Sequence, residues 1–242
     1  MQNITFTQYA LNSGRRFVNG SREEEILNVV IDSRKIHSAK ETLFIALQGS
    51  RHAGWEFATE AYGKGVRNFV LPNHCPRPLL KELKKANILL SSSPLKELQQ
   101  LAQINREAFA GVVIGITGSN GKTIVKEWLA QVLSAKYNLW KSPKSYNSQI
   151  GVALSALGIN SQHQLALLEA GISAPNEMNA LKEIIQPQLG IFTNIGSAHD
   201  ENFKDTASKL IEKCLLFKDV KFLVYNKDQE LVSNYLASNF DP

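Results

Sequence analysis

The feature that most constrains the fold of this chain is a glycine-rich segment between an apolar run and a helical pattern. Residues 112–116 (VVIGI) form the apolar run, and T-G-S-N-G-K-T follows at 117–123. Apolar residues then recur with helical spacing at Ile124, Val125, Trp128, Leu129 and Val132. A short apolar run that ends at turn residues indicates a buried strand, and recurrence every three or four residues indicates a helix. The segment therefore predicts a strand, a glycine loop and a helix.

Such a loop can hold phosphate. Gly118 and Gly121 allow the backbone to turn its N–H groups toward an anion, and the helix that begins near Lys122 offers its positive dipole end. Lys122 adds charge for the β- and γ-phosphates, and the Thr123 hydroxyl suits Mg²⁺. The common pattern G-x-x-x-x-G-K-[ST] is incomplete, because its first glycine position is Ile116. We therefore predict a variant ATP loop made of Thr117, Gly118, Ser119, Asn120, Gly121, Lys122 and Thr123. The alternative is a glycine turn that binds nothing.

Composition narrows the class of protein. Of 242 residues, 43% are hydrophobic and 20% charged, as in soluble globular proteins. No apolar run approaches the roughly 20 residues of a membrane helix, and the N-terminus has no signal-peptide pattern, so we expect a cytoplasmic protein without membrane insertion. Cys75 and Cys214 lack metal-ligand spacing, which favours free thiols. The basic residues behind the net charge of +5 are scattered, so nucleic acid is not implied.

Strands and helices alternate along most of the chain. Predicted strands cover residues 26–31, 43–47, 66–71, 88–90, 137–140, 164–168, 189–193 and 221–225. Predicted helices cover residues 54–62, 95–109, 150–157, 176–185, 206–217 and 229–237, and 72–78 is a non-helical connection. Regular alternation predicts a parallel sheet with ligands at the carboxyl ends of its strands. The fold class is α/β: a small N-terminal α/β domain (1–90), then a P-loop-type parallel-sheet ATP-binding domain (91–242), incomplete at its C-terminus.

Two polar residues follow predicted strands and are candidate metal ligands. Glu169 ends a strand in LLEAGIS, where a carboxylate can hold the Mg²⁺ of a nucleotide; the alternative is an exposed loop glutamate. His199 follows another strand in TNIGSAHDENF, where a neutral imidazole can bind a second divalent ion; the alternative is a structural histidine. We expect Glu169 and the Thr193-Asn194 pair to lie beside the glycine loop, because parallel strands end at one edge.

Four motifs follow one another along the second part of the chain: TGSNGKT (117–123), SYNSQIG (145–151), EAGIS (169–173) and TNIGSAH (193–199). In their order and approximate spacing they resemble the ATP-dependent Mur ligases of peptidoglycan synthesis. The stretches DSRKI (32–36), LFIALQG (43–49) and HAGWEFATEAYGKG (52–65) resemble the uridine-nucleotide-binding domain of the members that add D-alanyl-D-alanine to UDP-N-acetylmuramoyl-tripeptide. The resemblance covers nearly the whole chain. SYNSQIG, EAGIS and EKCLLF also resemble longer proteins in which such a ligase is fused to an alanine racemase.

The resemblance implies roles for residues around the glycine loop. Lys122 and Thr123 match the phosphate and Mg²⁺ residues of the family, Glu169 matches a metal-binding glutamate, and His199 matches the histidine of a second metal site. Asn147 matches an asparagine near the reacting groups.

Lys213, in KLIEKCLLF, stands at the position of a lysine that CO₂ carbamylates and that helps to bind the second Mg²⁺. Glu212, Cys214 and Leu215 depart from the family pattern around it. Taken alone, Lys213 would be a solvated helix residue.

In the N-terminal part, Ser33, Arg34, Gln48 and Gly49 match family positions near the uridine diphosphate. An arginine fork suits a diphosphate, although the Asp32-Ser33 pair could equally cap a turn. Ala53 stands where the family often has an aspartate, so any contact of that aspartate is lost.

The reaction implied is ATP-dependent formation of a carbon–nitrogen bond. The γ-phosphate passes to the carboxylate of the UDP-linked peptide, and the amine of D-alanyl-D-alanine displaces phosphate from the acyl phosphate. Lys122 and two Mg²⁺ ions would neutralise the charge that builds on the phosphoryl group. The family's C-terminal domain does not follow within these residues, so we expect this polypeptide alone to bind nucleotide weakly and to be inactive as a ligase.

Two other functions remain open. One is a different ligase of the same superfamily, of the tripeptide-forming or folylpolyglutamate type. The other is a non-catalytic ATP-binding module, which would need neither Glu169, His199 nor Lys213.

Overall fold

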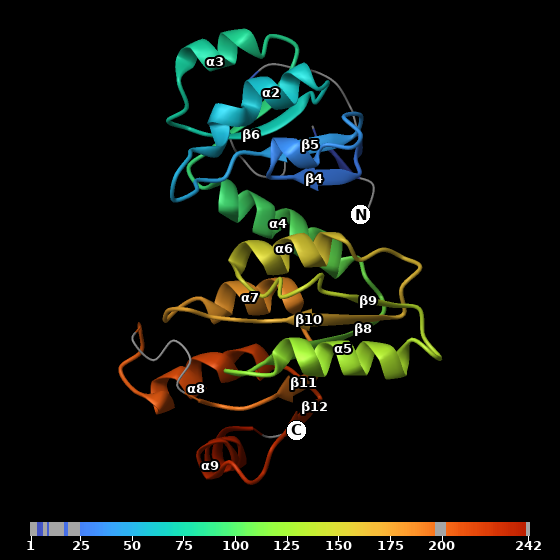
Figure 1. The fold of residues 1–242 in the computed structure, drawn as a ribbon, viewed down its shortest axis with the longest axis vertical. Helices are drawn as coiled ribbons and strands as arrows, with labels where there is room; N and C mark the ends of the chain where they lie inside the picture. The colour runs from blue at the N-terminus through green and yellow to red at the C-terminus, as the bar shows by residue number, and fades with distance from the viewer. Residues whose placement is uncertain (1–3, 7–8, 10–16, 19–24, 197–201, 241–242) are drawn as a thin grey trace. The chain divides into compact units, whose positions relative to one another are not determined.

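Residues 4–6, 9, 17–18, 25–196 and 202–240 are described by the computed structural model of this chain (Figure 1). The chain divides into two compact units, Met1–Leu98 and Gln99–Pro242. Helix α4 (Pro94–Glu107) carries the chain from the first unit into the second. None of the helices in the described ranges is long and apolar enough to span a membrane.

The first unit is built on a five-stranded sheet with the order β2-β7-β6-β5-β4. Four strands run parallel: β4 (Asn28–Val30), β5 (Thr42–Ile45), β6 (Asn68–Pro72) and β7 (Asn87–Ser91). The short β2 (Phe17–Val18) pairs antiparallel with β7. Every residue of β5, β6 and β7 is buried, which explains why these strands could be recognised as apolar runs.

Two expectations for this unit were wrong. The strand expected at 26–31 is divided into β3 (Glu25–Ile26), which pairs with β1 (Ile4–Thr5) in a separate sheet, and β4. The change of partner occurs where the N–H groups of Leu27 and Asn28 both donate to the carbonyl oxygen of Glu41. Each half of the apolar run therefore satisfies its backbone in a different sheet.

The second error concerns the connection at 72–78, which was expected to be non-helical. Helix α3 (Arg77–Glu82) begins within it, and a proline occupies its first turn. A proline there loses no hydrogen bond, because the first N–H groups of a helix have no partner within it. The other helical elements of this unit are η1 (Ser33–Lys35), η2 (Gly54–Phe57) and α2 (Ala58–Gly63).

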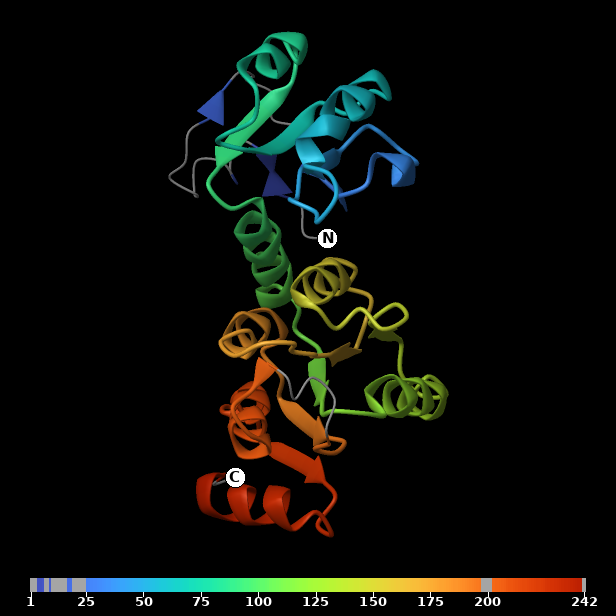
Figure 2. The same cartoon turned by 60° about the vertical axis from the view of Figure 1, so that its left-hand side comes forward.

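The second unit contains a parallel five-stranded sheet with the order β12-β11-β8-β10-β9. Its strands are β8 (Val112–Thr117), β9 (Leu139–Lys141), β10 (Leu165–Glu169), β11 (Leu189–Phe192) and β12 (Phe222–Tyr225). Its helices after α4 are α5 (Lys122–Leu133), α6 (Gln149–Leu157), α7 (Met178–Ile185), α8 (Thr206–Cys214) with η4 (Leu215–Phe217), and α9 (Glu230–Asn239). Helices lie on both sides of this sheet, with α5 opposite α7 and α8 (Figure 2). The predicted α/β class with a parallel sheet is confirmed.

Three of the five apolar residues that predicted α5 do not anchor it. Ile124, Trp128 and Val132 are 56%, 68% and 71% exposed. Leu129, Ala130 and Leu133 pack against the central strands instead. A lysine, Lys126, is completely buried on the same helix. The helical period therefore predicted the helix correctly but did not predict which of its faces is buried.

Candidate active site

The glycine loop connects the central strand β8 to helix α5, and its two glycines adopt conformations that other residues rarely take. Gly118 has φ +143° and Gly121 has φ +78°. A Cβ on Gly118 would lie 2.0 Å from Thr193 Oγ1. The loop can therefore pass this close to the end of β11 only with glycine at position 118.

Residues just after β11 hold the loop in place. Ser119 N donates to Asn194 O (2.8 Å), and Asn120 N donates to Asn194 Oδ1 (3.0 Å). Thr193 Oγ1 donates to Asn120 O (2.6 Å), and Gly196 N donates to Ser119 Oγ (3.0 Å). The expectation that Thr193 and Asn194 lie beside the glycine loop is confirmed. These bonds fix the conformation of the loop.

Lys122 is folded back over the loop. Its Nζ donates to Gly118 O (2.8 Å) and Ser119 O (3.1 Å). Burial lowers the pKa of Lys122, while the negative charge of Glu169 acts in the opposite direction. The loop therefore contains a partly desolvated ammonium group that is hydrogen-bonded to neutral carbonyl oxygens. Because an ionised acceptor forms a stronger hydrogen bond than a neutral carbonyl, this group is suited to bind an anion.

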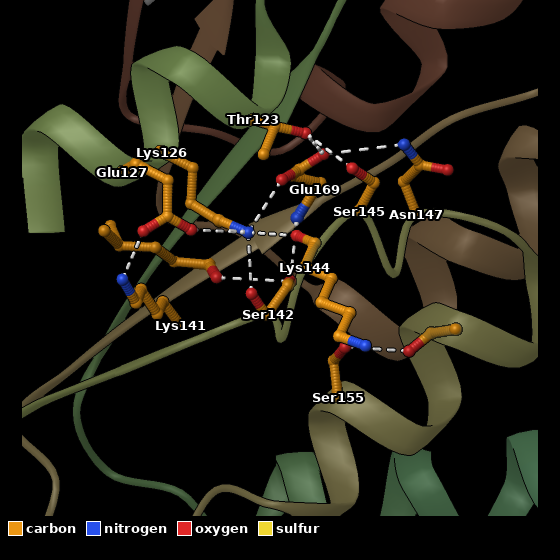
Figure 3. A network of polar contacts seen from close by, with 12 residues as sticks. Thr123, Lys126, Glu127, Lys141, Ser142, Lys144, Ser145, Asn147, Ser155 and Glu169 are labelled. Carbon is orange, nitrogen blue, oxygen red and sulfur yellow. Dashed lines mark hydrogen bonds and ion pairs between the residues drawn. The ribbon is translucent and has the colours of Figure 1, made fainter.

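Glu169 stands at the carboxyl end of β10, next to β8, and is fully buried. Thr123 Oγ1 donates to Glu169 Oε2 (3.0 Å) and lies 3.1 Å from Ser145 Oγ, while Asn147 Nδ2 lies 3.5 Å from the same Oε2 (Figure 3). The alternative of an exposed loop glutamate is therefore wrong. The fold brings Thr123, Glu169 and Asn147 together from three different segments.

The oxygen atoms of this group fit Mg²⁺. Among the described residues, no three His, Cys, Asp or Glu side chains form a metal-binding group. Mg²⁺ does not require one, since it is commonly held by one or two protein oxygens together with phosphate and water. Thr123 Oγ1 and Glu169 Oε2 are two hard oxygen atoms 3.0 Å apart beside the phosphate loop. His199, expected at a second ion, lies outside the described residues.

Lys213 reaches the same loop from α8. It is 2% exposed, and its Nζ donates to Gly118 O at 3.2 Å. Burial, with the nearby charges of Lys122 and Lys209, lowers the pKa of Lys213 from 10.5 to about 8. The alternative of a solvated helix residue is therefore wrong. Adjacent Cys214 is buried, and desolvation raises the pKa of its thiol to about 12, so the thiolate is disfavoured.

Replacement of Lys213 by methionine should change how the free energy of unfolding varies with pH. The folded protein releases the Lys213 proton near pH 8, whereas the unfolded chain keeps it until about pH 10.5, so this group makes stability rise with pH over that interval. The shift corresponds to at most about 3 kcal/mol. In urea titrations in CO₂-free buffer, the free energy of unfolding of Lys213→Met relative to that of the wild type should be highest at or below pH 8. This difference should fall as the pH rises toward 10.5. A difference independent of pH would contradict the prediction.

The candidate substrate residues of the first unit follow the ends of the parallel strands β4 and β5. Ser33 is buried, and its Oγ donates to Glu60 Oε2 on α2 at 2.8 Å. Arg34 is exposed, and two of its guanidinium nitrogens donate to the Asp32 carboxylate, each at 2.9 Å. These bonds hold the pKa of Asp32 at about 2. Asp32 also accepts from Arg34 N (3.0 Å), so the turn cap considered as an alternative is present as well.

Gln48 and Gly49 lie on a tight turn after β5. Gln48 forms a bridge with Ala53, and Gly49 N donates to His52 O at 3.0 Å. Because β4 and β5 are parallel neighbours, this turn and η1 follow the same edge of the sheet.

Sequence reasoning missed Lys126, whose ammonium lies 2.9 Å from Glu169 Oε1. The available signal was its position: Lys126 precedes Leu129 and Ala130 by three and four residues, on the face that packs against the sheet.

Known proteins resemble this chain in sequence and in fold. A family model described as the Mur ligase middle domain matches residues 116–240. The UDP-N-acetylmuramoyl-tripeptide–D-alanyl-D-alanine ligase of Borreliella burgdorferi is 34% identical over 203 residues, which is 81% of this chain and 44% of the relative. That of Bacillus subtilis is 31% identical over 220 residues, or 89% and 47%. The chain spans about half the length of the curated relatives it matches.

Two solved structures also resemble this chain. MurF ligase from Thermotoga maritima in complex with ADP has a TM-score of 0.77 at 27% identity, with coverage of 88% of this chain and 49% of that chain. MurF from Acinetobacter baumannii has a TM-score of 0.86 over 99% of this chain and 52% of that one, and at 22% identity it shows the fold alone. Because the family model covers just over half of the residues, this chain belongs to the Mur ligase family.

Proposed function

We propose that this chain provides the nucleotide-binding and UDP-substrate-binding parts of a ligase that adds D-alanyl-D-alanine to UDP-N-acetylmuramoyl-tripeptide. The observation that carries the proposal is the meeting of Lys122, Thr123, Asn147, Glu169 and Lys213 around one glycine loop. A turn without a ligand would need none of these side chains. The names of the curated relatives support the choice of substrates.

The loop would hold the phosphates of ATP. Support comes from the ADP complex of the Thermotoga maritima relative and from the glycine conformations of the loop. Lys122, now on two carbonyl oxygens, would turn to the transferred phosphoryl group. Thr123 and Glu169 would hold Mg²⁺, which neutralises charge on the phosphates. Asn147 would orient the substrate carboxylate that accepts the phosphoryl group, and the amine of D-alanyl-D-alanine would then displace phosphate.

Lys213 suits carbamylation. With a pKa of about 8, about one molecule in ten carries the neutral amine at pH 7. The Nζ lone pair would form a bond to the carbon of CO₂. The nitrogen would then release one proton, which gives a carbamate. The change from cation to anion would relieve the repulsion from Lys122 and Lys209 and would add an oxygen ligand beside Gly118. His199 would complete that second metal site.

In the first unit, Ser33, Arg34, Gln48 and Gly49 would contact the uridine diphosphate. Arg34 is exposed and already aligned by Asp32, so a diphosphate could engage its guanidinium without reorganising the turn. We assign residues 1–90 to substrate binding and 91–242 to ATP binding. A UDP-linked precursor as substrate supports a cytoplasmic location.

Calorimetric titration tests the two half-sites separately. The chain would be titrated in Mg²⁺ with a non-hydrolysable ATP analogue, with UDP-N-acetylmuramoyl-tripeptide and with the corresponding dipeptide. We expect the nucleotide and the tripeptide to bind, the latter more tightly than the dipeptide. Preference for the dipeptide would favour a tripeptide-forming ligase, and nucleotide binding without either UDP-peptide would overturn the assignment of the first unit.

Replacement of Arg34 by alanine should weaken binding of the UDP-peptide about 10- to 150-fold, because an arginine–phosphate contact contributes about 1.5–3 kcal/mol. Lys35→Ala, which removes an adjacent positive charge, is the matched control and should change the dissociation constant less than twofold. Nucleotide affinity should be the same in both variants. Equal losses of UDP-peptide binding in the two would indicate general electrostatic attraction instead of a specific contact.

A further inference from the structure

Lys126 is a fully buried lysine one helical turn after Lys122 on α5. Its Nζ lies 2.9 Å from Glu169 Oε1 and 3.2 Å from Glu127 Oε1. It also donates to the carbonyl oxygens of Ser142 (2.6 Å) and Lys144 (2.5 Å) (Figure 3). One ammonium group thus joins α5, the segment after β9 and the end of β10.

The charge of Lys126 is balanced mainly by Glu169. A buried charge is tolerated when it is paired and hydrogen-bonded. Glu127 is 42% exposed and also forms an ion pair with Lys141, so solvent screens its contribution. Glu169 shares the complete burial of Lys126. The buried pair is therefore Lys126 and Glu169.

The ion pair with Lys126 gives the two carboxylate oxygens of Glu169 different environments. Lys126 lies against Oε1, while Oε2 accepts from Thr123 and faces Asn147. The backbone is fixed as well, because Glu169 N donates to Ser142 Oγ at 3.2 Å. One carboxylate oxygen is thus presented beside Thr123, and the other is held on the opposite side.

We propose that Lys126 is a positioning residue for the nucleotide's cation: it holds Glu169 so that Oε2 is presented beside Thr123, and it fixes the segment that carries Ser145 and Asn147. This inference rests on the proposed function. In this arrangement Lys126 acts through Glu169 and the carbonyls of residues 142 and 144.

Two effects of removing Lys126 oppose each other. Loss of a nearby positive charge would strengthen the attraction between Glu169 and a cation. Loss of the ammonium would also leave two carbonyl oxygens without their buried donor and the Glu169 carboxylate without its buried counter-ion, and these groups must move to find other partners. We expect the second effect to dominate, because two carbonyl acceptors on one segment and a buried carboxylate on another depend on one group.

The test compares nucleotide binding with and without the cation. The chain and its Lys126→Met variant would be titrated with AMP-PNP by calorimetry, once in excess Mg²⁺ and once in EDTA. We expect Lys126→Met to weaken binding in Mg²⁺ by about 10- to 100-fold, as for other residues that orient metal ligands. Binding in EDTA should change less than twofold. Lys141→Met, which removes the exposed lysine paired with Glu127, should leave both affinities unchanged.

The outcomes separate this inference from the proposed function. If the wild-type chain binds no AMP-PNP in Mg²⁺, the proposed function fails and the inference falls with it. Suppose instead that the wild type binds AMP-PNP. If Lys126→Met then keeps the wild-type ratio between the affinity in Mg²⁺ and the affinity in EDTA, or binds more tightly than the wild type in Mg²⁺, the inference alone is overturned. Should Lys126→Met not fold, Lys126→Gln provides amide donors for the two carbonyls without the charge. It should show the same selective loss in Mg²⁺, whereas a merely structural lysine would lower the urea midpoint and leave the ratio unchanged.

Discussion

Replacing Lys122 by alanine is expected to weaken nucleotide binding by about 2–4 kcal/mol, or roughly 30- to 1,000-fold in Kd. Lys122 is already partly desolvated by the fold, as the lowering of its pKa by burial indicates. Its hydrogen bonds to Gly118 O and Ser119 O hold it within the loop, so little entropy is lost when a phosphate binds. Calorimetry with AMP-PNP in Mg²⁺ measures the effect.

The matched control is Lys136→Ala, which removes an exposed lysine just after α5 and should change Kd less than twofold. Lys122→Ala has a second expected effect: the charge of Lys122 helps to lower the pKa of Lys213, so that pKa should rise in the variant. Wild-type affinity in Lys122→Ala would contradict a phosphate site in the loop and would favour a glycine turn without a ligand.

Replacing Gly118 by alanine is expected to destabilise the second unit by about 2–6 kcal/mol, since backbone strain and overpacking each cost about 1–3 kcal/mol. Gly118 has φ +143°, and the added Cβ would lie 2.0 Å from Thr193 Oγ1. Thr193 cannot move freely, because its hydroxyl donates to Asn120 O at 2.6 Å. Relief of the clash therefore breaks a bond that shapes the loop, and nucleotide binding should be lost as well.

Urea unfolding followed by circular dichroism measures this change, with Gly196→Ala as the control. Gly196 contacts the same loop, but a Cβ there would lie 3.4 Å from Asn120 Nδ2, an ordinary contact. The control should alter stability by less than about 1 kcal/mol. If the two alanine variants proved equally stable, the tight approach of the loop to the end of β11 would not exist in solution.

The expectation that ligands lie at the carboxyl ends of parallel strands located much of the candidate site. Thr117, Glu169 and Thr193 were expected at one edge. Thr117 ends β8, Glu169 ends β10 and Thr193 directly follows β11, and these strands are neighbours in the sheet. That inference needs only the order of strands and helices, because parallel strands direct their carboxyl ends to one side. In the first unit, Ser33 and Gln48 were singled out by resemblance to the family, which did not indicate that Glu60 would hold Ser33.

The sequence alone determined the glycine loop, the alternation of strands and helices, and the edge of the sheet that carries the candidate site, because turn chemistry and periodicity are local properties. Burial of charged residues was decided by the tertiary structure. Lys213 resembles a solvated helix residue in sequence, yet it contacts the loop; Lys126 is buried on a helix whose Trp128 is exposed. The physical reason is that a lysine can be buried only where distant segments supply its oxygen partners. For Lys126 these are Glu169 and the carbonyls of Ser142 and Lys144, which only the folded sheet brings together.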